Sequence, residues 1–234
     1  MAIRTQKDKD FILSNLEETY YIENFISKED IETLSMEYYG NINKVYKNTG
    51  PITSDIKHYD SSTLNKIIDK ITKLYPNSKV MSGMFFEVKQ PHIIHNDDKH
   101  SLPLTYKAFN IPLEYDTNEE PHLCFFDQVY LDGPSKFFNG EKDIETYYNT
   151  IVYDYENVVG KSDEPIDPIM REKYLSHLED KWLQGLSFNS AHVWRPGNAI
   201  VFDCVRLHCA SNFVGKKSNF VGKKLGLSIF TEYH

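Results

Sequence analysis

From residue 79 onward, the sequence contains a series of short apolar segments of strand length that are separated by turns. Three segments precede residue 132 and four follow residue 190, with Arg195-Pro196-Gly197-Asn198 as the clearest turn. Short strands with repeated turn signals are typical of a β-sandwich or barrel, in which two sheets share one core. The predicted strands of this region are 79–89, 106–115, 122–131, 191–195, 199–205, 207–210 and 224–233. A further short strand is predicted ahead of it, at 19–26.

Two amphipathic helices are predicted ahead of this β-rich region. Ser27 is placed to cap the first helix, with Asp30 three residues on to complete a capping box. Ser62 is placed to cap the second helix, which has apolar residues at helical spacing and ends at Pro76. Helices followed by many short strands predict an α+β fold with a β-sandwich or barrel at its centre.

The length of 234 residues fits a single domain with a sizeable core. The insertion predicted between the two groups of strands is less regular. We expect a short strand at 151–155, and a helix that begins at Asp167-Pro168 and keeps one face through Trp182. The predicted parts of the domain are an N-terminal helical support at 1–78, a β core at 79–131 and 191–234, and an insertion at 132–190.

Composition excludes several classes of protein. The formal net charge is −8 and no stripe of basic residues is present, which argues against a nucleic-acid partner. The first ten residues are polar, and no apolar run approaches the roughly 20 residues that span a bilayer. The three cysteines form no C-x-x-C pair, which fits a reducing compartment. We therefore expect a soluble cytoplasmic protein with no membrane partner.

Two separated histidine motifs carry the strongest chemical signal. His95-Asn96-Asp97 follows an apolar segment, and residues i and i+2 of an extended chain project to the same side. His208 lies in the predicted strand 207–210. Two imidazoles and one carboxylate can bind Fe(II) on one face and leave the other face open. His92 and Asp98 are nearby rivals, but they do not have the i, i+2 spacing between them.

The approach to His208 is more specific than the His-x-Asp triplet. A Pro196-Gly197 turn leads into an apolar strand that ends in Phe202-Asp203, shortly before His208. In this order of motifs the chain resembles the Fe(II)/2-oxoglutarate-dependent oxygenases, in their prolyl-hydroxylase-like branch. The segment 21–30, Tyr-Ile-Glu-Asn-Phe-Ile-Ser-Lys-Glu-Asp, is also similar to the strand-to-helix junction of that branch. The resemblance covers nearly the whole chain except 132–190.

The resemblance implies a double-stranded β-helix, the jelly roll shared with cupins, with supporting N-terminal helices. It also implies a hydroxylase that uses Fe(II), 2-oxoglutarate and O2 and releases succinate and CO2. Fe(II) would be bound by His95, Asp97 and His208, and the presence of the Asp97 carboxylate favours hydroxylation over halogenation. The substrate stays open: a small molecule, an amino acid or a protein side chain.

The family also has a basic residue nine to eleven positions after the distal histidine, which binds the far carboxylate of 2-oxoglutarate. Lys224 lies sixteen positions after His208, which is too far. The heptad Ser-Asn-Phe-Val-Gly-Lys-Lys, however, occurs twice in tandem, at 211–217 and 218–224. Removing one copy restores the family spacing and makes Lys224 the preferred cation, with Lys217 and Lys223 as rivals because the phase of the strand is unknown.

Four further residues are candidates for binding 2-oxoglutarate. Ser228 shares a strand face with Lys224, and Tyr106 and Asn110 lie on the strand after the metal turn. Arg206 alternates with His208, so it could bind a substrate carboxylate or the iron-side carboxylate of 2-oxoglutarate. Plain alternatives are a core position for Tyr106 and an ion pair with a local aspartate for Arg206.

The insertion is a candidate lid over the metal site, and packing of a helix against the barrel is its plain alternative. Two other functions also stay open: a cupin-like metalloenzyme that does not use 2-oxoglutarate, and a non-catalytic jelly-roll binding module. Lys224 distinguishes the first, because such an enzyme has no need of that ammonium. Convergence of the three metal ligands distinguishes the second.

Overall fold

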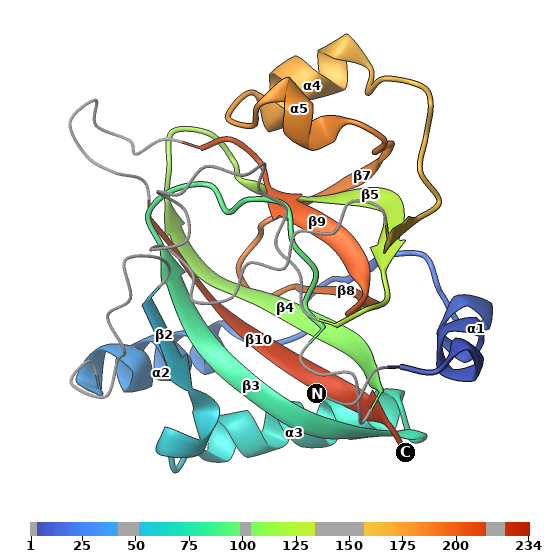
Figure 1. The fold of residues 1–234 in the computed structure, drawn as a ribbon. Helices are drawn as coiled ribbons and strands as arrows, with labels where there is room; N and C mark the ends of the chain where they lie inside the picture. The colour runs from blue at the N-terminus through green and yellow to red at the C-terminus, as the bar shows by residue number, and fades with distance from the viewer. Residues whose placement is uncertain (1–3, 42–51, 99–103, 134–156, 214–222) are drawn as a thin grey trace.

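Two antiparallel sheets that face each other form the centre of the molecule, and helices cover their outer faces (Figure 1). The computed structural model describes residues 4–41, 52–98, 104–133, 157–213 and 223–234. Among these residues, none of the helices is long and apolar enough to cross a membrane.

The larger, major sheet has six strands in the order β1-β8-β4-β10-β3-β2. The long strand β10 lies near its middle and pairs with β3 on one side and β4 on the other. Strands that are adjacent in this sheet are distant in sequence, so the sheet forms only when both groups of predicted strands come together. Its strands are β1 (Tyr20–Ile22), β2 (Ile52–Asp55), β3 (Ser78–Val88), β4 (Thr105–Asp116), β8 (Ala199–Asp203) and β10 (Lys223–Tyr233).

The smaller, minor sheet is centred on β5. β7 and the short β6 pair with one edge of β5, and β9 pairs with β5 as well. An isolated bridge between His95 and His208 adds the predicted metal turn to this sheet. The strands are β5 (His122–Tyr130), β6 (Val158–Val159), β7 (Phe188–Val193) and β9 (Arg206–Ala210).

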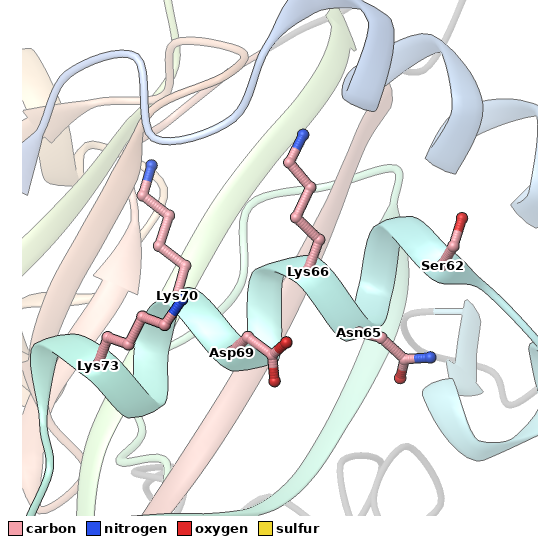
Figure 2. A pocket seen from close by; sticks show the side chains of 6 residues that line it. All are labelled: Ser62, Asn65, Lys66, Asp69, Lys70 and Lys73. Carbon is pink, nitrogen blue, oxygen red and sulfur yellow. The ribbon is translucent and has the colours of Figure 1, made fainter.

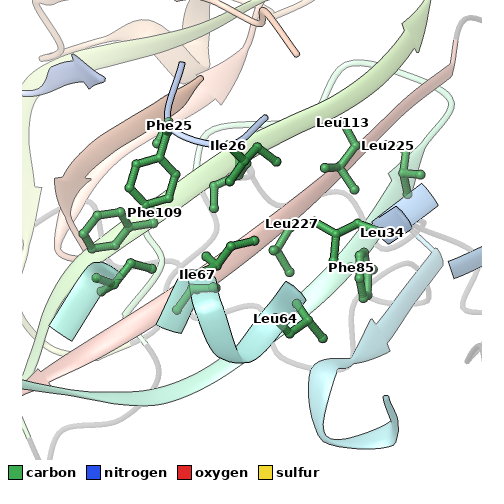
Figure 3. Close-up of a cluster of buried hydrophobic side chains, with 14 of the residues drawn as sticks. Phe25, Ile26, Leu34, Leu64, Ile67, Phe85, Phe109, Leu113, Leu225 and Leu227 are labelled. Carbon is green, nitrogen blue, oxygen red and sulfur yellow. The ribbon is translucent and has the colours of Figure 1, made fainter. Parts of the chain in front are cut away.

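Helices α2 (Lys28–Gly40) and α3 (Ser62–Leu74) pack on the outer face of the major sheet. Figure 3 shows the apolar cluster between them, in which Leu225 and Leu227 of β10 lie among Leu34, Leu64 and Ile67 from the two helices and other buried residues. Because side chains alternate along a strand, Lys224, Gly226 and Ser228 project from the opposite face, into the space between the sheets.

The minor sheet is covered in the same way. Two short helices, α4 (Pro168–Leu175) and α5 (Asp180–Leu183), pack on its outer face through an apolar cluster that includes Leu175, Leu183, Phe126 and Leu207. Figure 1 shows both helices beside β5 and β7. The described part of the insertion is therefore a cover on the barrel, and the rest of the candidate lid, 134–156, lies outside the described residues together with the strand predicted at 151–155.

The α+β class and the two-sheet core are confirmed, and each predicted strand in the described residues is present within a few residues of its expected bounds. Several features were wrong or missed. Ser61, not Ser62, caps α3. The helix expected to run to Trp182 ends at Leu175 and a second short helix follows. Helix α1 (Gln6–Ser14), strands β2 and β6 and the 3-10 helix η2 (Ile56–His58) were not expected.

Candidate metal centre

The three predicted metal ligands converge on the inner side of the minor sheet. His95 Nε2 lies 3.8 Å from Asp97 Oδ1, and His208 Nε2 lies 3.6 Å from Asp97 Oδ2. One ligand atom from each residue lies within 4.8 Å of the others. Metal–ligand bonds to nitrogen and oxygen are about 2 Å long, so small side-chain adjustments would close this set around one ion.

Backbone carbonyls orient both imidazoles. His95 Nδ1 lies 2.8 Å from the carbonyl oxygen of Ile93, and His208 Nδ1 lies 3.0 Å from that of Arg206. A carbonyl only accepts hydrogen bonds, so each Nδ1 carries the proton and each Nε2, the atom beside Asp97, has a lone pair. Such a second hydrogen bond is the usual way in which proteins set the tautomer of a ligating histidine.

The His95–Asp98 turn is held on several sides. His95 exchanges backbone hydrogen bonds with His208, at 3.0 and 2.9 Å, and the Asp97 amide donates to the Cys204 carbonyl at 2.8 Å. The Asn96 side chain donates to the carbonyls of Tyr130 and Gly133. The ligands are thus positioned by the backbone of β9 and by the end of β5.

The rival ligands have other partners. Asp98 forms a buried ion pair with Arg4 near the N-terminus, at 2.5 Å, and also accepts from Thr105 Oγ1. His92 contacts the Nδ1 side of His95, at 3.1 Å, rather than the side that faces Asp97. His95 and Asp97, not His92 and Asp98, are therefore the pair that meets His208.

Aromatic side chains enclose His208, which is only 1% exposed. Its ring lies 4.6 Å from that of Phe202 and 5.7 Å from that of Phe125, measured between centroids. Burial lowers the pKa of His208, although the Asp97 carboxylate opposes this effect. The imidazole is therefore neutral at neutral pH, which is the form that binds metals.

Lys224 is a buried cation on the inner face of β10. It is 2% exposed, and none of the ion pairs among the described residues includes it. Its Nζ lies 4.1 Å from the Trp194 ring centroid and 5.2 Å from that of Phe213. Burial lowers its pKa to about 7.

The phase of β10 separates Lys224 from its neighbour. Lys223 projects from the outer face, where its Nζ lies 3.1 Å from Glu87 and 3.8 Å from Glu114. The third rival, Lys217, lies outside the described residues. Of Lys223 and Lys224, only Lys224 projects between the sheets.

Ser228 and Asn110 lie on this inner face together. They are paired across β10 and β4, and Asn110 Nδ2 donates to Ser228 Oγ at 3.4 Å. Both are largely buried. Their placement fits the prediction that they line the same pocket as Lys224.

The structure does not bring Tyr106 to Lys224. Tyr106 precedes Tyr115, the β4 partner of Lys224, by nine residues, roughly 30 Å of strand. Its ring packs against Tyr75 and Tyr233 instead, as the plain alternative expected.

The Arg206 guanidinium donates to the backbone carbonyls of Phe126 and Glu17. These hydrogen bonds link β9 to β5 and to the segment after α1. Two N–H groups of Arg206 that were expected to bind a carboxylate therefore bind backbone carbonyls instead.

Trp194, whose ring lies over Lys224, was not among the predicted residues, although it lies just before the Pro196-Gly197 turn. Gly197 adopts a φ of +87°, which favours glycine, and a Cβ there would lie 3.2 Å from the Ile26 carbonyl. The turn fixes the end of β7 and so places the indole over Lys224. A large aromatic residue at a turn is the only signal that sequence offered.

A hollow on the outer side of α3 belongs to a different part of the molecule (Figure 2). All its lining residues come from this one helix, on the side of the major sheet that faces away from His208. Lys66 pairs with Asp30, and Lys70 donates to the Phe25 carbonyl. The residues that line the hollow are Ser62, Asn65, Lys66, Asp69, Lys70 and Lys73.

No protein-family model and no curated protein matches the sequence. Solved structures do match the fold. A prolyl-4-hydroxylase of Pseudomonas putida superimposes with a TM-score of 0.54 at 9% identity, over 95% of each chain. The chain has the fold of the iron- and 2-oxoglutarate-dependent oxygenases.

Two other structures with this fold extend the comparison. The non-haem, alpha-ketoglutarate-dependent epimerase SnoN from nogalamycin biosynthesis has a TM-score of 0.56 at 10% identity, over 98% of this chain and 84% of SnoN. EvdO2 from Micromonospora carbonacea var. aurantiaca, complexed with 2-oxoglutarate, has a TM-score of 0.51 at 11% identity, over 99% and 93%. SnoN was also solved with Fe3+ and alpha ketoglutarate. The superpositions show a shared fold, which confirms the jelly roll, and the printed reactions of these proteins differ.

Proposed function

We propose that this protein is an Fe(II)- and 2-oxoglutarate-dependent oxygenase that hydroxylates its substrate and releases succinate and CO2. One observation carries the proposal: the space between the sheets holds both a two-histidine, one-carboxylate set and a buried lysine without a carboxylate partner among the described residues. Either feature alone fits other proteins, but their combination fits an enzyme that binds a metal and a dicarboxylate together.

The donor set suits Fe(II). His95, Asp97 and His208 would occupy one face of the ion and leave positions for exogenous ligands, as in non-haem iron oxygenases. Iron and 2-oxoglutarate, when bound, supply the oxidising chemistry, in which O2 is consumed and 2-oxoglutarate is decarboxylated to succinate. The chain's own contribution is to orient the ligands through Ile93 and Arg206 and to exclude water.

A carboxylate of 2-oxoglutarate would match the positive charge of Lys224. Burying an ammonium without a counter-ion is unfavourable, and Lys224 has aromatic rings rather than carboxylates around its Nζ. A carboxylate bound there would restore the charge balance. Ser228 and Asn110 lie on the same face and add a hydroxyl and an amide for further hydrogen bonds.

Hydroxylation is the reaction that we favour, because Asp97 retains a carboxylate in the position that halogenases of this family leave open. Epimerisation is an alternative, since SnoN, an epimerase, has the same fold. The substrate would be a small molecule, an amino acid or a protein side chain, and the residues described here do not select among these classes.

The test is succinate formation from 2-oxoglutarate without any added substrate, since uncoupled turnover requires no knowledge of the substrate. We expect succinate when Fe(II), 2-oxoglutarate and O2 are all present, and none after chelation of the metal. His208→Ala should abolish the reaction, because it removes a metal ligand. His234→Ala, at the exposed C-terminus, is the matched control and should be unaffected.

A cupin-like metalloenzyme that does not use 2-oxoglutarate is the second candidate. It would bind the metal with the same three side chains but would form no succinate. Metal binding without succinate formation would favour this candidate, and equal succinate formation by His208→Ala would exclude the proposed metal ligands.

A further inference from the structure

Trp194 is a buried side chain with an unused hydrogen-bond donor. It follows β7, is 1% exposed, and its Nε1 has no hydrogen-bond partner among the described residues. Its backbone amide is satisfied by the Pro121 carbonyl, so the orphan is the indole N–H alone. Indole nitrogen is a donor only, and a buried donor without a partner is unfavourable. Among the described residues, the N–H group therefore lacks an acceptor that a bound ligand could supply.

The indole face lies against the proposed co-substrate cation. Lys224 Nζ is 4.1 Å from the ring centroid of Trp194, a cation–π contact. Trp194 also meets Phe86 edge to face, at 5.6 Å between centroids. These contacts fix the plane of the indole relative to the ammonium.

Gly226 identifies the direction of the indole edge. A Cβ built on Gly226 would lie 2.7 Å from Trp194 Cζ2 and 2.6 Å from Phe86 Cζ. Cζ2 and Nε1 are both bonded to Cε2, so the N–H group lies on the edge of the indole that approaches Gly226. Gly226 is midway between Lys224 and Ser228 on the inner face of β10, which brings this N–H group to the proposed binding site of the co-substrate.

We propose that Trp194 binds the far carboxylate of the co-substrate together with Lys224, by donating a hydrogen bond from Nε1. The inference rests on the proposed function and extends it. Lys224 would supply the charge and Trp194 a directed donor, while the absence of a side chain at Gly226 lets the indole edge lie close to β10. A co-substrate without a far carboxylate would gain nothing from either group.

The indole N–H can be observed directly by NMR in protein labelled with 15N at tryptophan. The chain has two tryptophans, so two indole signals are expected, and Trp182→Phe assigns them. Zn(II) replaces Fe(II) to avoid paramagnetism. The probes are 2-oxoglutarate and 2-oxopentanoate, which has the same metal-binding end and chain length but no far carboxylate.

We expect 2-oxoglutarate to shift the Trp194 indole proton downfield, as a hydrogen bond to a carboxylate forms, and 2-oxopentanoate to leave it nearly unchanged. Trp194→Phe keeps an aromatic face over Lys224 but lacks the donor. It should weaken 2-oxoglutarate binding, measured by calorimetry, roughly tenfold to a hundredfold, the range for a hydrogen bond to a charged group. Binding of 2-oxopentanoate should change less than about twofold by the same reasoning.

The failures are distinguishable. If 2-oxoglutarate binds more tightly than 2-oxopentanoate, and Lys224→Met removes that difference, the proposed co-substrate site stands. An indole signal that then responds equally to both acids overturns the role of Trp194. If wild-type protein binds the two acids equally, the proposed function and this inference both fail.

Discussion

The affinity for 2-oxoglutarate should fall as the pH rises above 7. Lys224 is the proposed partner of the far carboxylate, and burial lowers its pKa from 10.5 to about 7. In the protein without co-substrate, the amine is therefore charged below this pH and increasingly neutral above it. A bound carboxylate stabilises the ammonium and raises its pKa in the complex. The pH change is thus a perturbation of one buried charge.

The magnitude follows from proton linkage. Below pH 7 the lysine is already charged, so the affinity is nearly constant. Above pH 7 each binding event takes up one proton, and the dissociation constant rises about tenfold per pH unit until the pKa of the complex is reached. From pH 7 to pH 9 the increase is on the order of fiftyfold, if half of the lysine is charged at the start.

Calorimetry in buffers with different ionisation enthalpies measures both the affinity and the proton uptake. Zn(II)-loaded protein avoids turnover, and 2-oxopentanoate reports any pH effect at the metal end. Lys224→Arg is the matched variant, because arginine stays charged throughout this range. Its affinity should be nearly independent of pH between 7 and 9.

A flat pH profile for wild-type protein, with no proton uptake at pH 8, would refute the reasoning. So would an equal pH dependence for 2-oxoglutarate and 2-oxopentanoate, because the effect would then arise at the metal rather than at Lys224.

Two mutations test how the site is supported. Arg4→Met leaves the buried Asp98 carboxylate without its partner and should destabilise the protein by roughly 3–5 kcal/mol in urea unfolding; Lys28→Met, in an exposed ion pair, should have no measurable effect. Gly226→Ala places a methyl group against two aromatic rings beside the proposed co-substrate site and should weaken 2-oxoglutarate binding by about tenfold or more, as measured by calorimetry. Gly40→Ala, where no atom lies within 4 Å of the new methyl group, should leave binding unchanged.

The three candidate metal ligands could be predicted because each lies in a short motif that can be recognised in the sequence. His95 and Asp97 have the spacing of a strand end, and His208 follows a turn and an apolar strand, so all three were identified before their distances were known. The same reasoning selected Lys224 over Lys217 through the duplicated heptad. It could not select Lys224 over Lys223, because the inward face of a strand is set by its partners. In the structure, Glu87 and Glu114 pair with Lys223 on the outside.

Other features depend on contacts between distant residues. The ion pair between Arg4 and Asp98 joins residues 94 positions apart, so no local pattern reveals it. Strand β2 forms in a polar segment because β3 offers it an edge. The helix expected to reach Trp182 ends early, and the second helix lets Leu175 and Leu183 both pack on the minor sheet. Helix α1 did have a readable signal, the Thr5 capping box with Asp8.

The most direct test of the central claim is a crystal structure of the protein with Mn(II) and 2-oxoglutarate. We predict that the metal is bound by Nε2 of His95, Nε2 of His208 and a carboxylate oxygen of Asp97, and that the far carboxylate of 2-oxoglutarate contacts Lys224 Nζ. A metal bound by other residues, or a far carboxylate paired with a different cation such as Arg206, would contradict the account.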